Sequence, residues 1–164
     1  IVDINQLFLR SKILAKEILA QLLLVRQRAN GVGAGKSAVV LGLQGDLGGG
    51  KTTFLQGVAK GLGIKEKILS PTFVIMKKFN PPNLKFRYLY HFDCYRINRP
   101  KEILELGFKD IVSNPENIVA VEWSERIKKI LPQSTIIIKF DFVYPEQSRR
   151  ADKNKREICI SAAK

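Results

Sequence analysis

Residues 45–52 read Gly-Asp-Leu-Gly-Gly-Gly-Lys-Thr, a complete G-x-x-x-x-G-K-S/T phosphate-binding loop. An apolar run at 37–43 precedes this loop, and a helix-like stretch at 51–62 follows it. Glycines allow a crowded backbone in which successive N–H groups point at one phosphate, at the first turn of the following helix. The order of strand, loop and helix therefore predicts a βα unit that carries a nucleoside-triphosphate site.

A second glycine-rich stretch, residues 31–37, ends in Gly-Lys-Ser but does not complete the same pattern. Asn30 stands where the first glycine is required, and the polar segment 26–29 precedes it in place of a buried strand. We interpret this stretch as a connecting loop.

The size and composition of the chain limit the fold and the cellular setting. With 164 residues and 45% hydrophobic content, we expect one ordinary core and a single domain over residues 1–164. No apolar run approaches the roughly 20 residues that span a membrane, and the N-terminus lacks the order of a secretory signal. Cys94 and Cys159 have no metal-ligand spacing and are expected to stay reduced. These features predict a soluble, cytoplasmic protein without membrane contact.

The chain is strongly basic. It has 28 Lys and Arg residues against 15 Asp and Glu residues, which gives a net charge of +13. Such a charge favours polyanionic partners such as RNA, or acidic protein surfaces, through long-range attraction. The alternative is a solvated basic surface that serves no particular partner.

The remaining elements follow from hydrophobic periodicity and turn residues. In chain order we expect a helix at 4–25, a hairpin of strands 72–79 and 86–92, a short helix after Arg99-Pro100 that stops at Gly107, a strand at 118–121, a helix with Ser124 as its N-cap that runs to Leu131, and strands 135–142 and 157–161. This order predicts the α/β class, as a three-layer P-loop NTPase fold with a central, mainly parallel sheet and antiparallel hairpin additions.

The loop and one neighbouring strand supply candidate groups for ATP and Mg²⁺. Lys51 is expected to reach the β- and γ-phosphates, and the Thr52 hydroxyl is expected to bind Mg²⁺. Because Mg²⁺ prefers six oxygen ligands, a P-loop protein needs an acidic residue at the end of an adjacent strand. Glu122 follows strand 118–121 and fits that position, with a structural acid at the start of the next helix as the alternative.

Asp93 is a second acidic candidate, since it follows the apolar strand at 86–92. It is suited to bind the metal through water or to orient the attacking water. A structural salt bridge to Arg96 is the alternative for this residue.

Further motifs accompany the phosphate-binding loop in a fixed order. They are Ser-Pro-Thr-Phe at 70–73, His-Phe-Asp-Cys-Tyr-Arg at 91–96, and Glu-Trp at 122–123 followed by Glu125-Arg126. Together with the loop at 45–54, these motifs closely resemble the TsaE family, also called YjeE. The resemblance runs over about residues 11–160, and the family consists of bacterial ATPases required for threonylcarbamoyladenosine modification of tRNA.

The resemblance implies roles for individual positions. Lys51 and the backbone from Gly48 through Gly49, Gly50 and Thr52 to Thr53 would bind the ATP phosphates. Thr52 and Glu122 would hold Mg²⁺, and Asp93 would act with Lys51 and Glu122 as a catalytic group.

The resemblance also assigns two positions outside the loop. Ser11 matches a threonine that lines the adenine site in the family, although Ala15 replaces the glycine of that pattern. Thr72 lies in a segment similar to a switch that is ordered by the γ-phosphate. The alternative for Thr72 is a simple turn into a strand. His91 and Trp123 fit structural roles as well as roles at the site.

The family resemblance implies a switch ATPase with weak turnover alone, which acts with the TsaB and TsaD proteins on adenosine 37 of tRNA. Hydrolysis would reset the complex, while carbamoyl transfer would belong to TsaD. The basic stretch at 145–156, with Arg149, Arg150, Lys153, Lys155 and Arg156, is a candidate contact for tRNA phosphates or an acidic partner. A solvated hairpin loop is the alternative for this stretch.

Two other classes of protein share parts of the pattern. A small-molecule or nucleoside kinase has the same loop and sheet, and the basic stretch at 145–156 would then be its lid. A nucleic-acid-binding protein without turnover would explain the net charge but would leave Thr52, Asp93 and Glu122 without a purpose.

Overall fold

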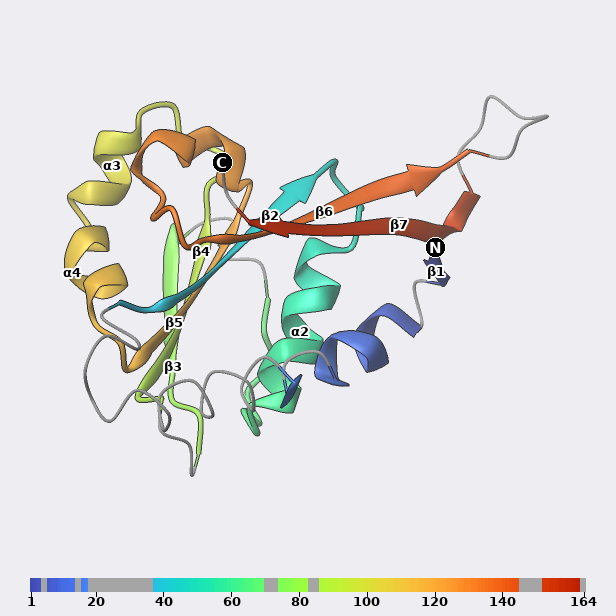
Figure 1. Cartoon of the computed structure of the whole chain (residues 1–164), viewed down its shortest axis with the longest axis horizontal. Helices are drawn as coiled ribbons and strands as arrows, with labels where there is room; N and C mark the ends of the chain where they lie inside the picture. The colour runs from blue at the N-terminus through green and yellow to red at the C-terminus, as the bar shows by residue number, and fades with distance from the viewer. Residues whose placement is uncertain are drawn as a thin grey trace.

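The computed structural model describes residues 1–3, 6–13, 16–17, 37–69, 74–82, 86–144 and 152–162. Residues 6–13 and 16–17 are helical. The labelled elements of Figure 1 are strands β1 (Val2–Asp3), β2 (Val39–Gly45), β3 (Met76–Phe79), β4 (Tyr88–Asp93), β5 (Asn117–Glu122), β6 (Ile136–Val143) and β7 (Asp152–Ala162), and helices α2 (Lys51–Gly61), α3 (Pro100–Leu104) and α4 (Phe108–Ser113). A 3-10 helix, η1, covers Ser124–Ile130.

Within the described residues, the strands form one seven-stranded sheet in the order β1-β7-β6-β2-β5-β4-β3. The four central strands β6, β2, β5 and β4 run parallel to one another. Antiparallel pairs extend the sheet at both edges, with β3 against β4 and with β7 against β6 and β1. The predicted α/β class, the parallel centre and both antiparallel hairpins are confirmed.

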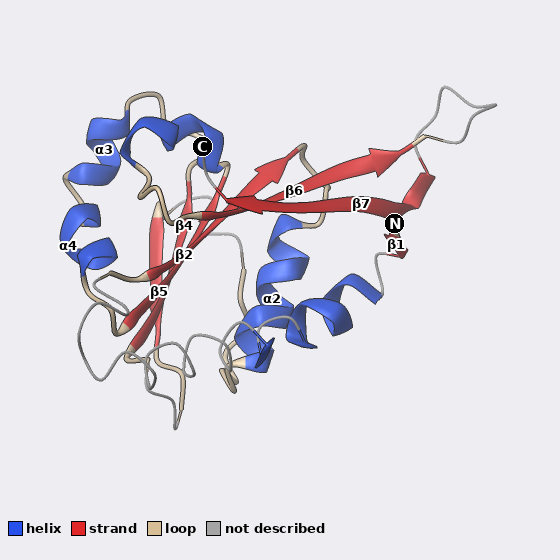
Figure 2. Cartoon of the chain, viewed as in Figure 1, coloured by secondary structure: helices blue, strands red, loops and turns tan. Residues whose placement is uncertain are grey.

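Helices cover both faces of the sheet, so the fold has three layers (Figure 2). One core lies between the sheet and α2 with the N-terminal helical residues, and it includes Leu7, Leu41, Leu43, Phe54 and Leu55. The other lies between the sheet and α3, α4 and η1, and it includes Val40, Phe92, Ile103, Phe108 and Ile127. Because successive side chains of β2 enter opposite cores, this strand reads as a near-continuous apolar run.

Several predicted boundaries hold within a few residues, whereas some elements were not predicted. Helix α4 begins after Gly107, whose φ of 75° starts a new helix where we expected only a stop. Strand β1 and the N-terminal part of β7 were also absent from the prediction. The predicted helix at 4–25 lies partly outside the described residues, and the segments 30–36 and 70–73 lie wholly outside them.

The prediction that Ser124 caps a helix is wrong. Trp123, with φ 58°, is the capping residue of η1, and no side chain makes the cap hydrogen bond. Ser124 is fully buried, and a Cβ atom added to Gly42 would lie 2.9 Å from its Oγ atom. The small side chain is therefore needed because η1 packs directly against β2.

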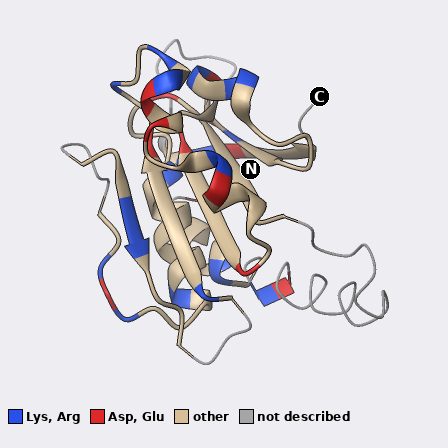
Figure 3. Ribbon diagram, turned by 90° about the vertical axis from the view of Figure 1, so that its left-hand side faces the viewer, with Lys and Arg blue, Asp and Glu red and all other residues tan. Residues whose placement is uncertain are grey.

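The basic residues are distributed over the fold. Lys and Arg residues lie on helices, strands and loops in separate parts of the ribbon (Figure 3). No helix within the described residues has both the length and the apolar character needed to cross a membrane. Both cysteines are free thiols, with Cys94 buried and Cys159 exposed.

Candidate nucleotide-binding site

The phosphate-binding loop lies at the carboxyl end of β2, between β2 and α2. In the parallel register, Glu122 of β5 is level with Leu43 of β2 and with Asp93 of β4. The loop and the two acidic residues therefore meet at the same edge of the sheet. Ligands of open α/β sheets bind at this edge, outside the carboxyl ends of the strands.

Glycine is required within the loop by backbone conformation and by space. Gly48 and Gly50 have φ values of 75° and 105°, a region that side chains disfavour. Gly45 has φ 131°, and a Cβ atom there would lie 2.3 Å from the carbonyl oxygen of Phe140 in β6. The Gly49 N–H donates to the Asp46 carbonyl at 3.0 Å, which closes the turn just before α2 begins.

A cavity of about 380 Å³ opens at this loop. The residues that line it are Leu47, Gly48, Gly49, Gly50, Lys51, Thr52, Thr53, Asp93, Tyr95, Glu122 and Trp123. The structure thus brings the predicted phosphate, metal and catalytic residues together in one cavity. Ser11 is the predicted site residue that does not line it.

The side chain of Lys51 folds back onto the phosphate-binding loop. Its Nζ atom donates to the carbonyls of Gly45 at 2.5 Å and Asp46 at 2.8 Å, and lies 3.9 Å from the centroid of the Trp123 ring. Burial lowers the pKa of this amine, and the nearby charge of Glu122 acts in the opposite direction. The ammonium group is therefore part of the cavity wall, within reach of a bound anion.

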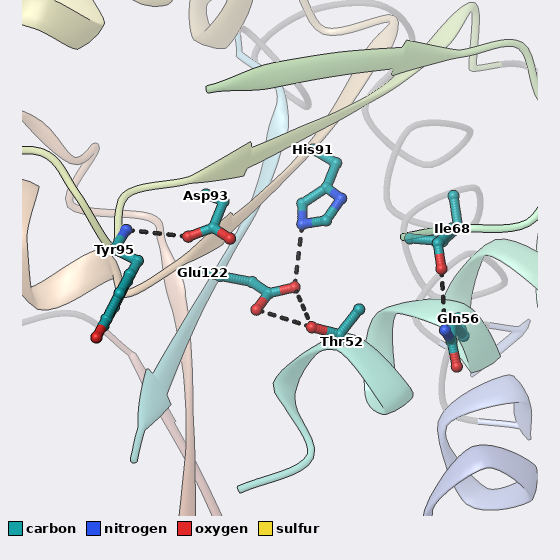
Figure 4. A network of polar contacts seen from close by, with 7 residues as sticks. All are labelled: Thr52, Gln56, Ile68, His91, Asp93, Tyr95 and Glu122. Atoms are coloured by element: carbon teal, nitrogen blue, oxygen red, sulfur yellow. Dashed lines mark hydrogen bonds and ion pairs between the residues drawn. The ribbon is translucent and has the colours of Figure 1, made fainter. Parts of the chain in front are cut away.

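A network of polar contacts joins the loop to β4 and β5 (Figure 4). The Thr52 hydroxyl donates to Glu122, with its oxygen 2.8 Å from Oε1 and 3.0 Å from Oε2. The His91 Nε2 atom lies 3.0 Å from the same Oε1 atom. His91 is fully buried and its Nδ1 atom has no hydrogen-bond partner among the described atoms. The contacts of its ring orient Glu122 toward the loop.

The donor set of this network fits Mg²⁺. A hydroxyl and a carboxylate in contact are the kind of oxygen ligands that Mg²⁺ uses together with phosphate and water oxygens. Among the described residues, no group of three or more His, Cys, Asp and Glu side chains forms a self-contained metal site.

Asp93 lines the same cavity and lies on the side of Glu122 opposite to Thr52 (Figure 4). Its Oδ1 atom accepts a hydrogen bond from the backbone N–H of Tyr95 at 2.9 Å, and the residue is 8% exposed. The N–H of Cys94 donates to the Glu122 carbonyl at 3.0 Å, which ties the two strand ends together. The Asp93 carboxylate is therefore fixed in orientation while it borders the ligand space.

Two aromatic side chains, those of Tyr95 and Trp123, line the cavity. The rings of Tyr95 and Trp123 lie 5.0 Å apart between centroids. Tyr95 is 41% exposed, and Leu47, which also lines the cavity, is 75% exposed. The mouth of the site therefore presents exposed apolar groups.

Ser11 lies in a different place from the phosphate cavity. It lines a second cavity of about 250 Å³ with Leu7, Arg10 and Phe54 among its neighbours. Its hydroxyl donates to the Phe8 carbonyl at 2.9 Å, and a Cβ atom on Gly57 would lie 1.9 Å from its Oγ atom. Ser11 is thus packed closely against α2, and its adenine contact stays a prediction.

Arg156 contacts the phosphate-binding loop, although we expected it in a solvated or partner-binding loop. It is 4% exposed and lies in β7, where it donates hydrogen bonds to the carbonyls of Gly48 and Gly49. The sequence contained one indication of this placement. Side chains alternate along a strand, so Arg156 shares one face of β7 with Ile158 and Ile160.

Comparison with known proteins gives one consistent family. The family model described as "Threonylcarbamoyl adenosine biosynthesis protein TsaE" matches residues 14–151. A Bacillus subtilis protein named tRNA threonylcarbamoyladenosine biosynthesis protein TsaE is 40% identical over 127 residues, 77% of this chain and 72% of that protein. The Haemophilus influenzae protein of the same name is 36% identical over 107 residues, which are 65% of each chain.

A solved structure is similar to this chain in fold and in sequence. The crystal structure of YdiB from Bacillus subtilis has a TM-score of 0.63 and 30% sequence identity, and the match covers 100% of this chain and 83% of that chain. The matched residues 14–151 contain the phosphate-binding loop, Asp93 and Glu122. The chain therefore belongs to the TsaE family.

Proposed function

We propose that this protein is an Mg²⁺-dependent ATPase that serves threonylcarbamoyladenosine modification of tRNA together with TsaB and TsaD. The single observation that carries the ATPase assignment is the contact of Thr52 with Glu122 at 2.8 Å, beside Lys51 in one cavity. The tRNA pathway rests on membership of the TsaE family. We propose weak turnover in the isolated chain and faster turnover in the complex.

Each wall of the cavity has its own task in hydrolysis. N–H groups of the loop and of the first turn of α2 within residues 48–53 hold the phosphates, apart from that of Gly49, which donates to the Asp46 carbonyl. Lys51 balances the charge of the β- and γ-phosphates. When bound, Mg²⁺ neutralises charge on the phosphate oxygens, and Thr52 and Glu122 are the residues that would hold it.

Asp93 orients the water that attacks the γ-phosphorus. The new bond forms from the water oxygen, the bond to the bridging oxygen of ADP breaks, and the proton of the water passes to the released phosphate. The hydrogen bond from Tyr95 N–H to Asp93 supports this role, because a carboxylate can position water only if its own orientation is fixed.

The backbone links Asp93 to the segment that resembles a switch. The N–H of Asp93 donates to the Ile75 carbonyl at 3.0 Å, and Ile75 follows Thr72 by three residues. Residues 70–73 therefore lie just before the residue whose carbonyl holds the backbone of Asp93. This connection supports a switch in which the γ-phosphate and the catalytic acid are coupled.

The exposed mouth of the cavity supports a role for partner proteins. Tyr95 and Leu47 are exposed residues of the cavity lining, and a partner that covers them would exclude water from the site. We propose that TsaB and TsaD stimulate hydrolysis in this way.

The cavity lined by Ser11 and Phe54 is the proposed place for adenine, since Phe54 follows the phosphate-binding residue Thr53 in α2.

The kinase alternative requires the basic stretch at 145–156 to act as a lid. Strands β6 and β7 on either side of residues 145–151 pair antiparallel, so the stretch connects a hairpin. Arg156, the last basic residue of the stretch, is buried within β7. We therefore favour the ATPase.

The decisive experiment is ATP hydrolysis by the purified chain, alone and with TsaB and TsaD of the same organism. We expect slow turnover alone, faster turnover in the mixture, and none from Lys51→Ala. Lys60→Ala is the matched control, because Lys60 is an exposed lysine of the same helix. Full turnover by Lys51→Ala would contradict the phosphate site, and phosphate transfer to a small acceptor would favour the kinase.

A further inference from the structure

We propose that Arg156 is a positioning residue for the phosphate-binding loop, and that its guanidinium group sets the affinity of the site for nucleoside di- and triphosphates. The inference rests on the nucleotide site proposed above. Arg156 lies outside the residues matched by the family model, which end at 151. It does not line the phosphate cavity, so it acts on the ligand through the loop.

The contacts of Arg156 converge on two successive peptide groups of the loop. Its Nη2 atom donates to the Gly48 carbonyl at 3.0 Å, and its Nε atom donates to the Gly49 carbonyl at 3.2 Å. The Nη1 atom donates to the Lys155 carbonyl at 2.7 Å, and the guanidinium carbon lies 4.2 Å from the centroid of the Phe142 ring. The planar group is thus fixed from several directions.

The orientation of these carbonyls determines the orientation of the N–H groups that follow them in the loop. In a trans peptide group the C=O bond and the next residue's N–H bond point in opposite directions. Holding the Gly48 carbonyl fixes the Gly49 N–H, which closes the turn onto Asp46. Holding the Gly49 carbonyl fixes the Gly50 N–H, at the start of α2. A hydrogen bond to the carbonyl also polarises the peptide group, which makes its N–H a stronger donor.

The loop needs such support because of its composition. Three glycines in succession lose more conformational freedom on ordering than any other residues would. A loop that is ordered before the ligand arrives has less entropy to lose on binding, and affinity rises accordingly. Arginine suits this task better than lysine, since its rigid fork presents several donors at once.

The β6–β7 hairpin delivers Arg156 to this position. Arg156 is paired with Phe142 across the hairpin, and the register shifts between Phe142 and Val143. The carbonyl of Phe140, in β6 of the same hairpin, lies close to both Gly45 and Gly49. The hairpin therefore supports the loop with a backbone contact, an aromatic ring and a buried cation, whose charge also favours an anionic ligand.

The test is the dissociation constant for fluorescent ATP and ADP analogues with Mg²⁺, measured on the full chain. We expect Arg156→Gln to raise the dissociation constants of the ATP and ADP analogues by about tenfold. This is the loss of affinity expected when one to two ordinary hydrogen bonds are removed. Arg156→Lys should fall between this variant and the unmodified protein, because it keeps the charge but not the fork. Lys155→Gln is the matched control, since it removes the same charge from the adjacent exposed residue and should change affinity by less than about twofold.

Two further readouts separate positioning from general destabilisation. The melting temperature without nucleotide should stay within a few degrees in Arg156→Lys, while KM for ATP rises and kcat changes by less than about threefold. If Arg156→Gln does not fold, Arg156→Lys decides the matter. A folded Arg156→Lys with a dissociation constant within twofold of the unmodified protein would overturn the proposal, and a loss of threefold or more would support it.

Lys51→Ala distinguishes failure of the inference from failure of the proposed function. If Lys51→Ala loses nucleotide binding while folded Arg156 variants keep it, only the role of Arg156 is wrong. If Lys51→Ala binds ATP normally, the nucleotide site itself is wrong.

Discussion

The phosphate-binding loop lies between two flanks of opposite charge. The acid flank consists of the ends of β4 and β5, with Asp93 and Glu122. The basic flank consists of the β6–β7 hairpin, with Phe142 and Arg156. Both acids line the phosphate cavity, whereas Arg156 is not among its lining residues and donates to two carbonyls of the loop.

This difference separates two contributions to one site. Groups of the acid flank border the ligand space, so they act on the metal, the water and the phosphate oxygens. The basic flank acts on the geometry of the loop before any ligand is bound. Changes in the acid flank should therefore reduce turnover, and changes in the basic flank should reduce affinity.

The largest effect is expected from Glu122→Ala in the acid flank. The variant removes the proposed metal ligand and leaves Thr52 and His91 without their shared acceptor. We expect ATP turnover in the presence of TsaB and TsaD to fall about a hundredfold, while ATP affinity changes much less. Glu122→Gln, which preserves the shape, serves as the control for packing. Unchanged turnover would assign the metal to Asp93.

Asp93→Asn should have a smaller effect, of about tenfold on turnover at saturating ATP. The amide oxygen can still accept the hydrogen bond from Tyr95 N–H, so the strand end keeps its conformation. Nucleotide affinity, measured by titration of a fluorescent analogue, should stay within about twofold. A large loss of affinity instead would place Asp93 among the metal ligands and would remove the distinction between the two acids.

The two flanks also differ in how far the sequence predicted them. The acid flank follows from local signals, because the apolar runs that end at Asp93 and Glu122 identify neighbouring strands of a parallel sheet. Once the strands are parallel, their carboxyl ends must meet at one edge, and the observed register places the two acids level with each other. The loop and α2 were predicted for the same reason, since glycine spacing and helical periodicity are local.

The structure of the basic flank depends on contacts between residues far apart in the chain, which local sequence patterns do not predict. Arg156 is 107 residues from Gly49 in the chain, and its contact requires the register of an antiparallel hairpin and a shift between Phe142 and Val143. A charged residue is usually exposed, so a basic stretch suggests a solvated loop. Ser124 is a similar case, because serine serves either as a helix cap or as a small core residue. Its role as a core residue follows only from its close contact with Gly42, which lies far from it in the sequence.

The smallest functional effect is expected from alkylation of a cysteine on the basic flank. Burial, with the nearby charges of Asp93 and Glu125, raises the pKa of Cys94 to about 12, whereas Cys159 of β7 is exposed. Iodoacetamide at pH 8 should add one group per native chain, at Cys159, and two in denaturant, as mass spectrometry will determine. Raising the pH to about 9.5 should add no second group to the native chain, because Cys94 stays protonated.

The sign of the linked stability change follows from the same thiol. Cys94 has a higher pKa in the folded chain than its ordinary value of 9.0, so the unfolded chain loses this proton first as the pH rises. Its contribution to the free energy of unfolding is therefore full below about pH 9 and declines toward pH 12, which denaturant titrations across this range would measure.

The alkylated protein also tests the division of β7 into two faces. Cys159 and Arg156 are three positions apart, so their side chains leave the strand on opposite faces. If the basic flank acts only through the face that carries Arg156, the adduct at Cys159 should change ATP affinity by less than about twofold. A larger loss would mean that the loop responds to the hairpin as a whole, and the role of Arg156 would then extend to the entire strand.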